Sequence, residues 1–185
     1  MRKLLKFILV VLVCYFIAVV SNVVFLEQIV ISGKSMESNF SEGEFGLADK
    51  QIYKLSSLNR FDVVVIKEGN DYIIKRIIGL PNETIFYKDG VLMVNDEVVY
   101  ENFIDESTKL ETNRNGMEIL VTLKDHEYYV LGDNRVISYD SRNIGPIHKD
   151  LIKGRVFVIY GKCENLVCEV NKCNCDRRYF IPRFI

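Results

Sequence analysis

Apolar and polar positions follow two different patterns along this chain. The first is a continuous apolar run, in which residues Phe7 to Phe25 carry no charged side chain over 19 positions. As a helix this run would be roughly 28 Å long, close to the thickness of the hydrocarbon core of a bilayer. The pattern therefore predicts one membrane-spanning helix at the N-terminus.

Basic residues before the apolar run indicate its orientation, because positive charge favours the cytosolic side of a membrane. They are Arg2, Lys3 and Lys6. A cleaved secretory signal begins in the same way, but its apolar part usually has about 7–15 residues and ends at a small-residue site. This run is longer and no clean site follows it. We therefore expect a cytosolic N-terminus over residues 1–6, a retained single-pass anchor over 7–27 in the cell membrane, and an extracytoplasmic remainder.

From residue 28 onward, apolar residues recur mostly at every second position, which is the period of a β-strand. Asp89-Gly90 lies between two such runs and predicts a hairpin. No convincing amphipathic helix follows the anchor. The predicted strands are Phe61–Lys67, Tyr72–Gly79, Glu83–Lys88, Val91–Asn95, Glu97–Glu101, Glu127–Gly132 and Arg155–Gly161.

These strands predict a mainly β protein. We expect an antiparallel β-sheet body over residues 28–162, preceded by the one N-terminal transmembrane helix. Residues from about 81 to 124 would form a small β-insertion whose distal end is polar. Residues 163–185 would form a separate tail rich in cysteine, basic and aromatic residues.

Charge and composition exclude some functions. The formal net charge is -1 at pH 7. Binding to nucleic acid needs clustered Lys and Arg, so no nucleic-acid partner is expected. No Gly-rich phosphate loop and no internal repeat is present.

The tail contains four cysteines within 13 residues, namely Cys163, Cys168, Cys173 and Cys175. Outside the membrane they indicate one or two disulfides, with three possible full pairings. Zinc binding is the alternative, although the usual C-x₂-C spacing is absent. The final RRYFIPRFI is either a contact for lipid headgroups or a strand packed on the body.

The segment SGKSMESNF, Ser32 to Phe40, places three serines beside a lysine and a glutamate. A serine hydroxyl is a weak nucleophile unless an adjacent base accepts its proton. The two histidines of the chain, His126 and His148, both lie in charged, turn-like segments. We expect them on the surface, and a different base is therefore needed.

Lys75 is the alternative base. Strand alternation places it between Ile73 and Ile77 on one face, in an apolar setting. Burial lowers the pKa of an amine, and lowering it to about 7 would cost roughly 4.6 kcal/mol. A cost of this size in a small, marginally stable domain indicates that the buried amine has a use. The alternatives are an edge-strand lysine that reaches water, or strand faces that are the reverse of this assignment.

A polar segment, GDNRVISYDSRNIGP, follows the strand that ends at Gly132. Asp140 and Arg142 are two residues apart and would share one face of an extended chain. A buried amine also needs an acceptor that does not recharge it, and the hydroxyl of Ser138 suits that role. The alternative is a solvated loop with Asx turns.

The apolar N-terminus, SGKSM, KRIIGLP, and GDNRVISYDSR followed by IGP together resemble the type I signal peptidases, which are membrane-anchored Ser–Lys proteases. The resemblance implies an antiparallel β body with a β-insertion and no cofactor or metal. It implies that Ser35 is the nucleophile and Lys75 the general base. Ser138 would orient the amine, with Asp140 and Arg142 as the supporting pair.

The resemblance also implies that the backbone N–H of Ser35 forms part of the oxyanion hole. Some members add a hydroxyl donor two residues earlier, where this chain has Gly33. The family usually continues SM-x-Pro-Thr, whereas this chain has Ser38 and Asn39. Because proline would stiffen the segment, we expect a looser loop around Ser35.

The predicted function is that of a membrane-bound serine endopeptidase that removes signal peptides from exported preproteins. Its partners would be those preproteins and the lipid bilayer, close to the secretion translocon. The resemblance implies small side chains at substrate positions −1 and −3. One alternative is a non-catalytic or specialised anchored factor of the same fold in surface-fibre assembly. Another is a self-cleaving regulator of the SOS-repressor type, which the anchor and the lack of a DNA-binding module disfavour.

Overall fold

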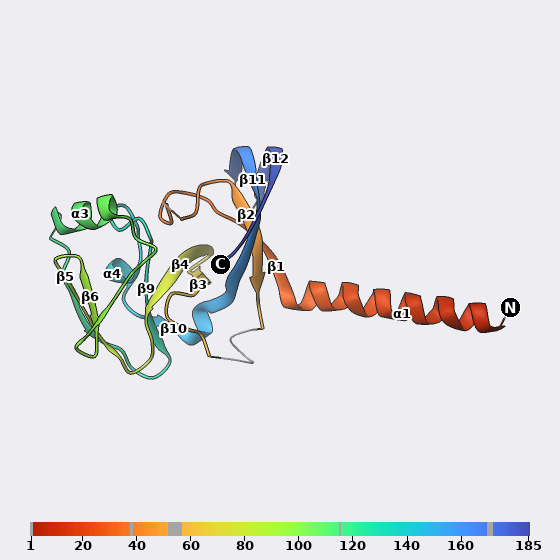
Figure 1. Cartoon of the computed structure of the whole chain (residues 1–185), viewed down its shortest axis with the longest axis horizontal. Coiled ribbons are helices and arrows are strands. Elements are labelled where there is room, and N and C mark those ends of the chain that lie inside the picture. Colours follow the sequence, from red (N-terminus) through yellow and green to blue (C-terminus); the bar gives the residue numbers. More distant parts are fainter. Residues whose placement is uncertain (1, 38, 52–56, 115, 170–171) are drawn as a thin grey trace.

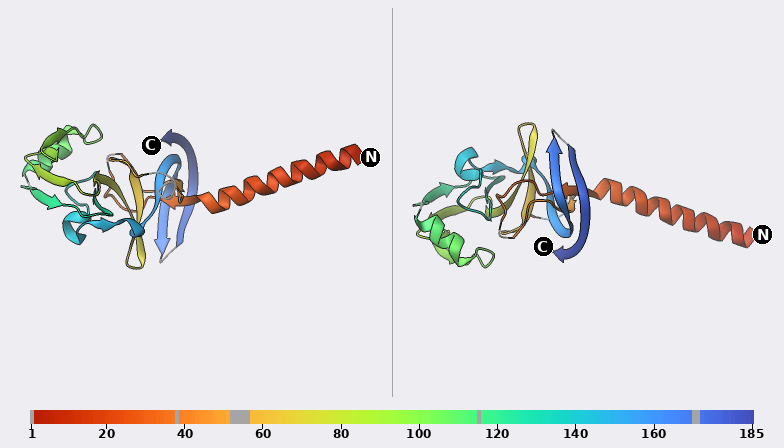
Figure 2. Two further views of the ribbon diagram at one scale, coloured as in Figure 1. Left: turned by 90° about the horizontal axis from the view of Figure 1, so that it is seen from below. Right: turned by 90° about the horizontal axis from the view of Figure 1, so that it is seen from above.

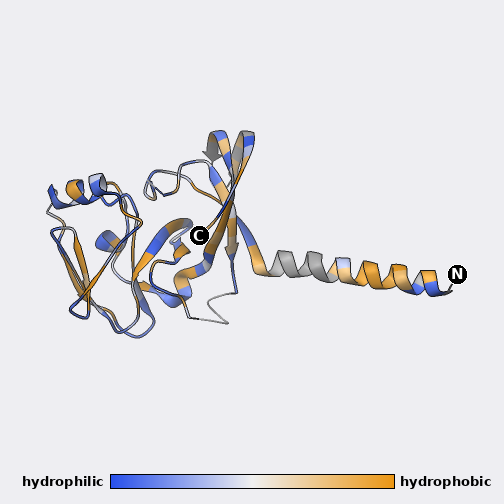
Figure 3. Ribbon diagram, in the orientation of Figure 1, coloured by the Kyte–Doolittle hydropathy of each residue, from blue (hydrophilic) through white to orange (hydrophobic). Residues whose placement is uncertain are grey.

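The computed structural model describes all residues except 1, 38, 52–56, 115 and 170–171. Helix α1 (Arg2–Phe25) projects from one end of a body made mostly of strands (Figure 1). Figure 3 shows mostly apolar residues in the coloured part of α1 and apolar residues alternating with polar ones along the strands. Within the described residues, no helix combines the length and the apolarity needed to cross a membrane.

The larger sheet has eight strands, in the order β1-β2-β11-β3-β4-β9-β10, with β12 paired to β11. Every pairing in it is antiparallel, as the sequence predicts. The strands are β1 (Leu26–Val30), β2 (Glu44–Asp49), β3 (Val63–Glu68), β4 (Asp71–Gly79), β9 (Glu127–Leu131), β10 (Ile147–His148), β11 (Ile152–Glu169) and β12 (Lys172–Phe184).

A smaller four-stranded sheet lies within residues 81–124, in the order β7-β6-β5-β8. The hairpin predicted at Asp89-Gly90 is formed, because Lys88 pairs with Val91. Both turn residues have positive φ, 51° and 76°, as a two-residue hairpin of primed type requires. The strands are β5 (Thr84–Lys88), β6 (Val91–Val94), β7 (Glu97–Val99) and β8 (Ile119–Thr122).

The polar end of this region forms a helix, α3 (Glu106–Arg114), that the hydrophobic pattern does not predict. Asp105 caps it, since its Oδ1 accepts the N–H of Thr108 at 2.8 Å. Thr112 is the buried residue of this helix. A helix with so little buried surface leaves no apolar stripe in the sequence, so periodicity could not reveal it.

Two apolar clusters fix the parts of the body that matter for the site. The first joins β1, β2, β3 and β11 to the segment after β1, through Ile31, Met36 and Phe40. The second joins the end of β4 and β9 to the smaller sheet, through Ile78, Leu131 and Tyr87 among others. The segment that contains Ser35 is thus packed onto the larger sheet.

The C-terminal residues form a long hairpin rather than a separate segment. Strand β11 runs on through residue 163, and β12 returns antiparallel to it from Lys172. A disulfide joins Cys163 to Cys175, and Cys173 is also disulfide-bonded. Cys168 stands opposite Cys173 in the strand register, but its side chain lies outside the described residues. Figure 2 shows this hairpin beside the end of α1 from which β1 begins.

Candidate active site

Ser35 lies in a tight turn after β1. Gly33 starts the turn with a φ of +83°, a conformation that favours glycine. The carbonyl of Met36 then accepts the N–H of Phe40 at 2.9 Å. Met36 and Phe40 are buried in the core of the larger sheet, so they hold the half-buried Ser35 in place between them and the glycine.

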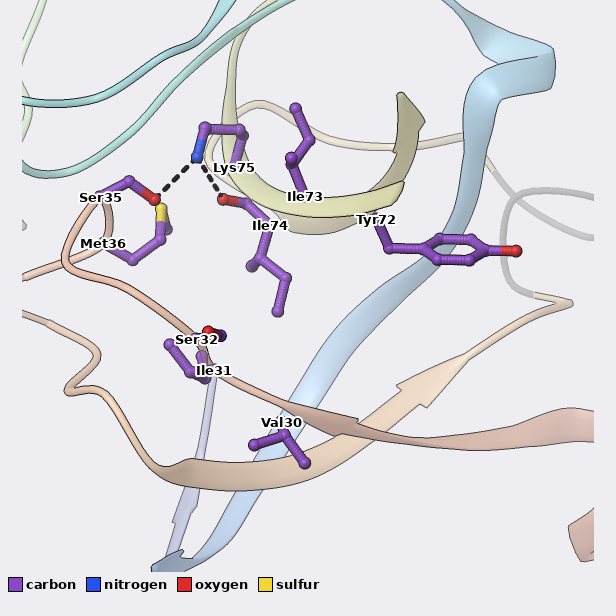
Figure 4. Close-up of a pocket in the computed structure, with 9 residues that line it drawn as sticks. All are labelled: Val30, Ile31, Ser32, Ser35, Met36, Tyr72, Ile73, Ile74 and Lys75. Carbon is purple, nitrogen blue, oxygen red and sulfur yellow. Dashed lines mark hydrogen bonds between the residues drawn. The ribbon is translucent and has the colours of Figure 1, made fainter. Parts of the chain in front are cut away.

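Lys75 lies on β4, and only 3% of its surface is exposed. Its Nζ atom donates to Oγ of Ser35 at 2.8 Å and to the carbonyl of Ile74 at 3.1 Å (Figure 4). The two residues predicted from separate motifs are therefore in direct contact. A hydroxyl and an amine at this distance can exchange a proton.

The surroundings of Lys75 favour its neutral form. Burial lowers the pKa of Lys75, the negative charges of Asp140 and Asp133 raise it, and the positive charge of Arg142 lowers it again. The net result is a pKa below the ordinary value of an amine. Since only the neutral amine can accept a proton, this shift makes Lys75 a better base near neutral pH.

An ion pair that the sequence analysis did not assign lies next to Lys75. The guanidinium of Arg76 bonds both carboxylate oxygens of Asp133, at 2.8 and 2.6 Å, and both residues are buried. The ring of Phe103 lies 4.2 Å from the same guanidinium. Arg76 thereby compensates the negative charge of Asp133, which would otherwise act more strongly on the amine of Lys75. The sequence signal was the arginine directly after the lysine on a strand.

The chain after β9 approaches Ser35 closely. The N–H of Asn134 donates to the carbonyl of Ser35 at 3.1 Å. A Cβ at Gly132 would lie 2.2 Å from Oγ of Ser138 and 2.4 Å from the carbonyl oxygen of Ser35. Only glycine leaves room for this approach.

Ser138 is buried beside this contact. Its Oγ makes no hydrogen bond of standard geometry within the described part of the chain, but it lies close enough to the carboxylate of Asp140 to help lower the pKa of that group. The second bond of the Lys75 amine goes to the carbonyl of Ile74 instead. Ser138 is thus a buried hydroxyl close to Ser35 that has unused hydrogen-bonding capacity.

Asp140 and Arg142 form the ion pair that their spacing predicts. Two hydrogen bonds between their side chains join them, at 2.8 and 2.7 Å, and Asp140 is fully buried. Arg142 also donates to the carbonyl of Ser138 at 3.2 Å. Asp140 accepts the N–H of Gly132 at 3.0 Å and caps the short helix α4 (Ser141–Ile144). The pair therefore holds both ends of the segment from Gly132 to Ser138 by hydrogen bonds to its backbone.

The ionised form of Asp140 is favoured. Burial raises the pKa of its carboxyl. The hydrogen bonds and charge of Arg142, together with the N–H of Gly132, lower this pKa by more than burial raises it. The net pKa lies below the ordinary value. Asp140 thus stays charged and paired at neutral pH.

A pocket adjoins the contact between Ser35 and Lys75. One wall comes from the end of β1 and the segment after it, and the other comes from β4 (Figure 4). Within the described residues, β1 pairs only with β2, while the Asp71–Lys75 half of β4 pairs only with β3. Both walls therefore include a strand edge without a partner strand. The pocket is lined by Val30, Ile31, Ser32, Ser35, Met36, Tyr72, Ile73, Ile74 and Lys75.

The two histidines lie away from this pocket. His126 and His148 are exposed, and their ring centroids are 6.0 Å apart. Neither lines the pocket that contains Ser35.

Comparisons with known proteins identify the family of this chain. A family model described as signal peptidase, peptidase S26, matches residues 2–161. Signal peptidase I V of Bacillus subtilis (strain 168) is 39% identical over 148 residues, which cover 73% of this chain and 85% of the relative. Signal peptidase I of Bacillus licheniformis is 30% identical over 161 residues, which cover 83% of this chain and 86% of the relative.

Among solved structures, a signal peptidase I from Enterococcus faecalis V583 is 29% identical and matches with a TM-score of 0.48. The match covers 54% of this chain and 97% of that one. By its family-model match and its relatives, the chain belongs to the signal peptidase family of serine peptidases, peptidase S26. The resemblance seen in the sequence is thereby confirmed.

Proposed function

We propose that this chain removes signal peptides from exported preproteins as a membrane-bound serine endopeptidase. Ser35 is the nucleophile and Lys75 the general base. One observation carries the assignment: the amine of a lysine that is 3% exposed lies 2.8 Å from the hydroxyl of Ser35. Membership of the signal peptidase family supports the choice of substrate.

The reaction begins when neutral Lys75 accepts the proton of the Ser35 hydroxyl. Oγ of Ser35 attacks the carbonyl carbon of the scissile peptide bond, and negative charge develops on the carbonyl oxygen. Within the described residues the backbone N–H of Ser35 has no hydrogen-bond partner, so it is available to stabilise that oxygen. Protonated Lys75 then donates its proton to the leaving amine. Water attacks the acyl-enzyme, with Lys75 again as the base.

The pocket suits an extended peptide. Two strand edges without partners, in β1 and in the first half of β4, offer backbone groups that pair with a third strand. Alternate side chains of such a strand point the same way. The −1 and −3 side chains of the substrate would then both face the apolar wall formed by Ile31, Met36 and Ile74. The family resemblance implies that these substrate side chains are small.

Three further residues support the base. Asp140 and Arg142 hold the segment after Gly132 through their ion pair and through the carbonyl of Ser138. The buried hydroxyl of Ser138, which lies beside Asp140, is available to orient the amine of Lys75 once substrate is bound. Hydrogen bonds in active sites often tighten only in the complex with substrate.

Helix α1 would anchor the enzyme, with residues 1–6 in the cytosol, the remainder of the helix to Phe25 in the bilayer and the β body outside; the anchor expected over 7–27 is thereby shortened, because Leu26 and Glu27 already belong to β1. Large apolar side chains along this helix are exposed, including Phe7 and Phe16 at 67% each. Burial of such side chains in lipid is favourable. Confinement to one membrane surface raises the effective concentration of enzyme and leader peptide, close to the secretion translocon.

Cleavage of a purified preprotein in detergent, from about pH 6 to about pH 10, tests this proposal. We expect Ser35→Ala and Lys75→Ala to abolish cleavage while leaving the circular dichroism spectrum unchanged. Ser32→Ala is the matched control, because Ser32 lines the same pocket without contacting Lys75. Failure of the folded wild type to cut any of several preproteins would reject the proposal in favour of an anchored assembly factor.

A further inference from the structure

The C-terminal strand reaches the turn that carries Ser35, although it lies beyond the residues matched by the family model. That match ends at residue 161. Strand β12 pairs with β11 so that Arg183 stands opposite Ile159, a core residue that belongs to the same apolar cluster as Met36 and Phe40. The N–H of Ile185 adds a bond to the carbonyl of Phe157 at 3.0 Å. The end of β12 is therefore fixed over this cluster.

Arg183 makes three contacts there. Its Nη2 atom donates to the carbonyl of Asn39 at 2.5 Å and to Oε2 of Glu44 at 2.6 Å. Its guanidinium also lies over the ring of Phe40, 5.2 Å from the centroid. Glu44 is buried and accepts the N–H of Ser41 through the same oxygen. A charged donor thus binds the turn at its far end from Ser35.

Asn39 is held from its other side as well. Its Nδ2 atom donates to the carbonyl of Phe103 at 2.7 Å and to Oδ2 of Asp133 at 3.0 Å. Asp133 is the partner of Arg76, which follows Lys75 on β4. The carbonyl side of Asn39 is therefore tied to the C-terminal hairpin, and its side chain is tied to the ion pair beside Lys75.

We infer that Arg183 is a positioning residue for the nucleophile, acting through the carbonyl of Asn39; the inference rests on the proposed role of Ser35. The chain has no proline between Ser32 and Phe40 that would restrict the backbone of the turn. In this chain a bond from the C-terminal hairpin restricts the turn instead. Such control matters because a shift of about 1 Å in a reacting group can cost about a hundredfold in rate.

The disulfide between Cys163 and Cys175 helps to keep Arg183 in place. It crosslinks β11 and β12 at Cys163, which lies farther along β11 than Ile159, the residue that pairs with Arg183. The register of the two strands shifts between Ile159 and Gly161, which lies between the disulfide and Arg183. The crosslink therefore limits sliding of β12 along β11, and sliding would withdraw Arg183 from Asn39.

Kinetics of Arg183→Ala test the inference. We expect kcat to fall about ten- to a hundredfold, with KM changed less than about twofold, because the turn that carries Ser35 shifts while the strand edges of β1 and β4 that would pair with the substrate remain. Arg183→Lys, which keeps one charged donor, should recover part of the loss. Arg178→Ala is the matched control, because Arg178 lies on the same strand but its guanidinium contacts the ring of Phe45.

Amide hydrogen exchange over residues 34–41 gives a readout that does not depend on activity. We expect faster exchange there in Arg183→Ala than in Arg178→Ala, at equal melting temperatures. Reduction of the hairpin disulfides should lower kcat of the wild type and add no further loss in Arg183→Ala. If Arg183→Ala does not fold, Arg183→Lys and Glu44→Gln carry the same comparison.

The outcomes separate this inference from the proposed function. An inactive wild type would reject the proposed function, while hydrogen exchange would still report whether Arg183 orders the turn. An active wild type with equal kcat and equal exchange in Arg183→Ala and Arg178→Ala would overturn the positioning role alone. The role would also be overturned if Arg183→Ala lost kcat only in proportion to its loss of melting temperature and Arg183→Lys recovered none of that kcat.

Discussion

The amine of Lys75 lies 2.8 Å from the hydroxyl of Ser35, although 40 positions separate them in the chain. The contact forms because β4 and the turn after β1 pack on the same sheet. Lys75 is buried there without an ion-pair partner in the described part of the chain. The packing that buries Lys75 thus both lowers the pKa of its amine and holds the amine against the hydroxyl of Ser35.

Replacement of Lys75 by methionine should separate stability from activity. Lys75→Met removes a poorly solvated amine and keeps the volume of the side chain, so we expect an equal or higher melting temperature. Cleavage should fall at least about a thousandfold, since the base is lost. Lys67→Met, on the adjacent strand and exposed, is the control and should retain activity. A large fall in melting temperature with Lys75→Met would show that the buried amine does not destabilise the folded protein.

The lowered pKa of Lys75 predicts the pH dependence of both activity and stability. Cleavage should increase as the pH rises through the lowered pKa, because the neutral amine is the base. Between that pKa and the ordinary value of 10.5, the unfolded chain binds more protons at this site than the folded one. The contribution of Lys75 to the free energy of unfolding therefore increases with pH across this window. Denaturant titrations of wild type and Lys75→Met at several pH values should show this difference, and parallel profiles would exclude it.

Removal of the charge on Asp140 should destabilise the protein. In Asp140→Asn the guanidinium of Arg142 and the N–H of Gly132 lose a carboxylate partner, at a cost of about 3 kcal/mol. Because the pKa of Asp140 is lowered in the folded state, this contribution is present above the ordinary value of 3.8 and is lost as the pH falls through the lowered pKa. Urea titrations at neutral and acidic pH measure it. Asp150→Asn, whose side chain is 89% exposed, should have almost no effect.

Gly132 should not tolerate even one added methyl group. In Gly132→Ala the Cβ would lie 2.2 Å from Oγ of Ser138 and 2.4 Å from the carbonyl of Ser35, so the backbone must shift. We expect a loss of about 1–3 kcal/mol in stability and a larger relative loss of cleavage. Gly69→Ala is the comparison, because nothing lies within 4 Å of its added Cβ and only its φ of +58° is unfavourable. Equal cleavage by the two variants would show that the close approach has no role.

Some strands could be predicted because their side chains alternate. The predicted ranges overlap β3, β4, β5, β6, β7, β9 and β11. Strand β2 could not be found in this way, because Gly46 interrupts its pattern. A Cβ at Gly46 would lie 2.2 Å from the carbonyl of Val158, so the close approach of β11 requires glycine there. Its strand conformation comes from pairing with β1 and β11 and not from local propensity.

By itself the sequence determined the mainly β class, the family, and the residues that could do chemistry, because these depend on short motifs and on local periodicity. Only the tertiary structure decided which of these residues meet. It brought Arg76 to Asp133 across 57 positions and Arg183 to Asn39 across 144. Contacts at such separations depend on strand order and register, and each register is selected by the burial of a whole face and not by any local pattern.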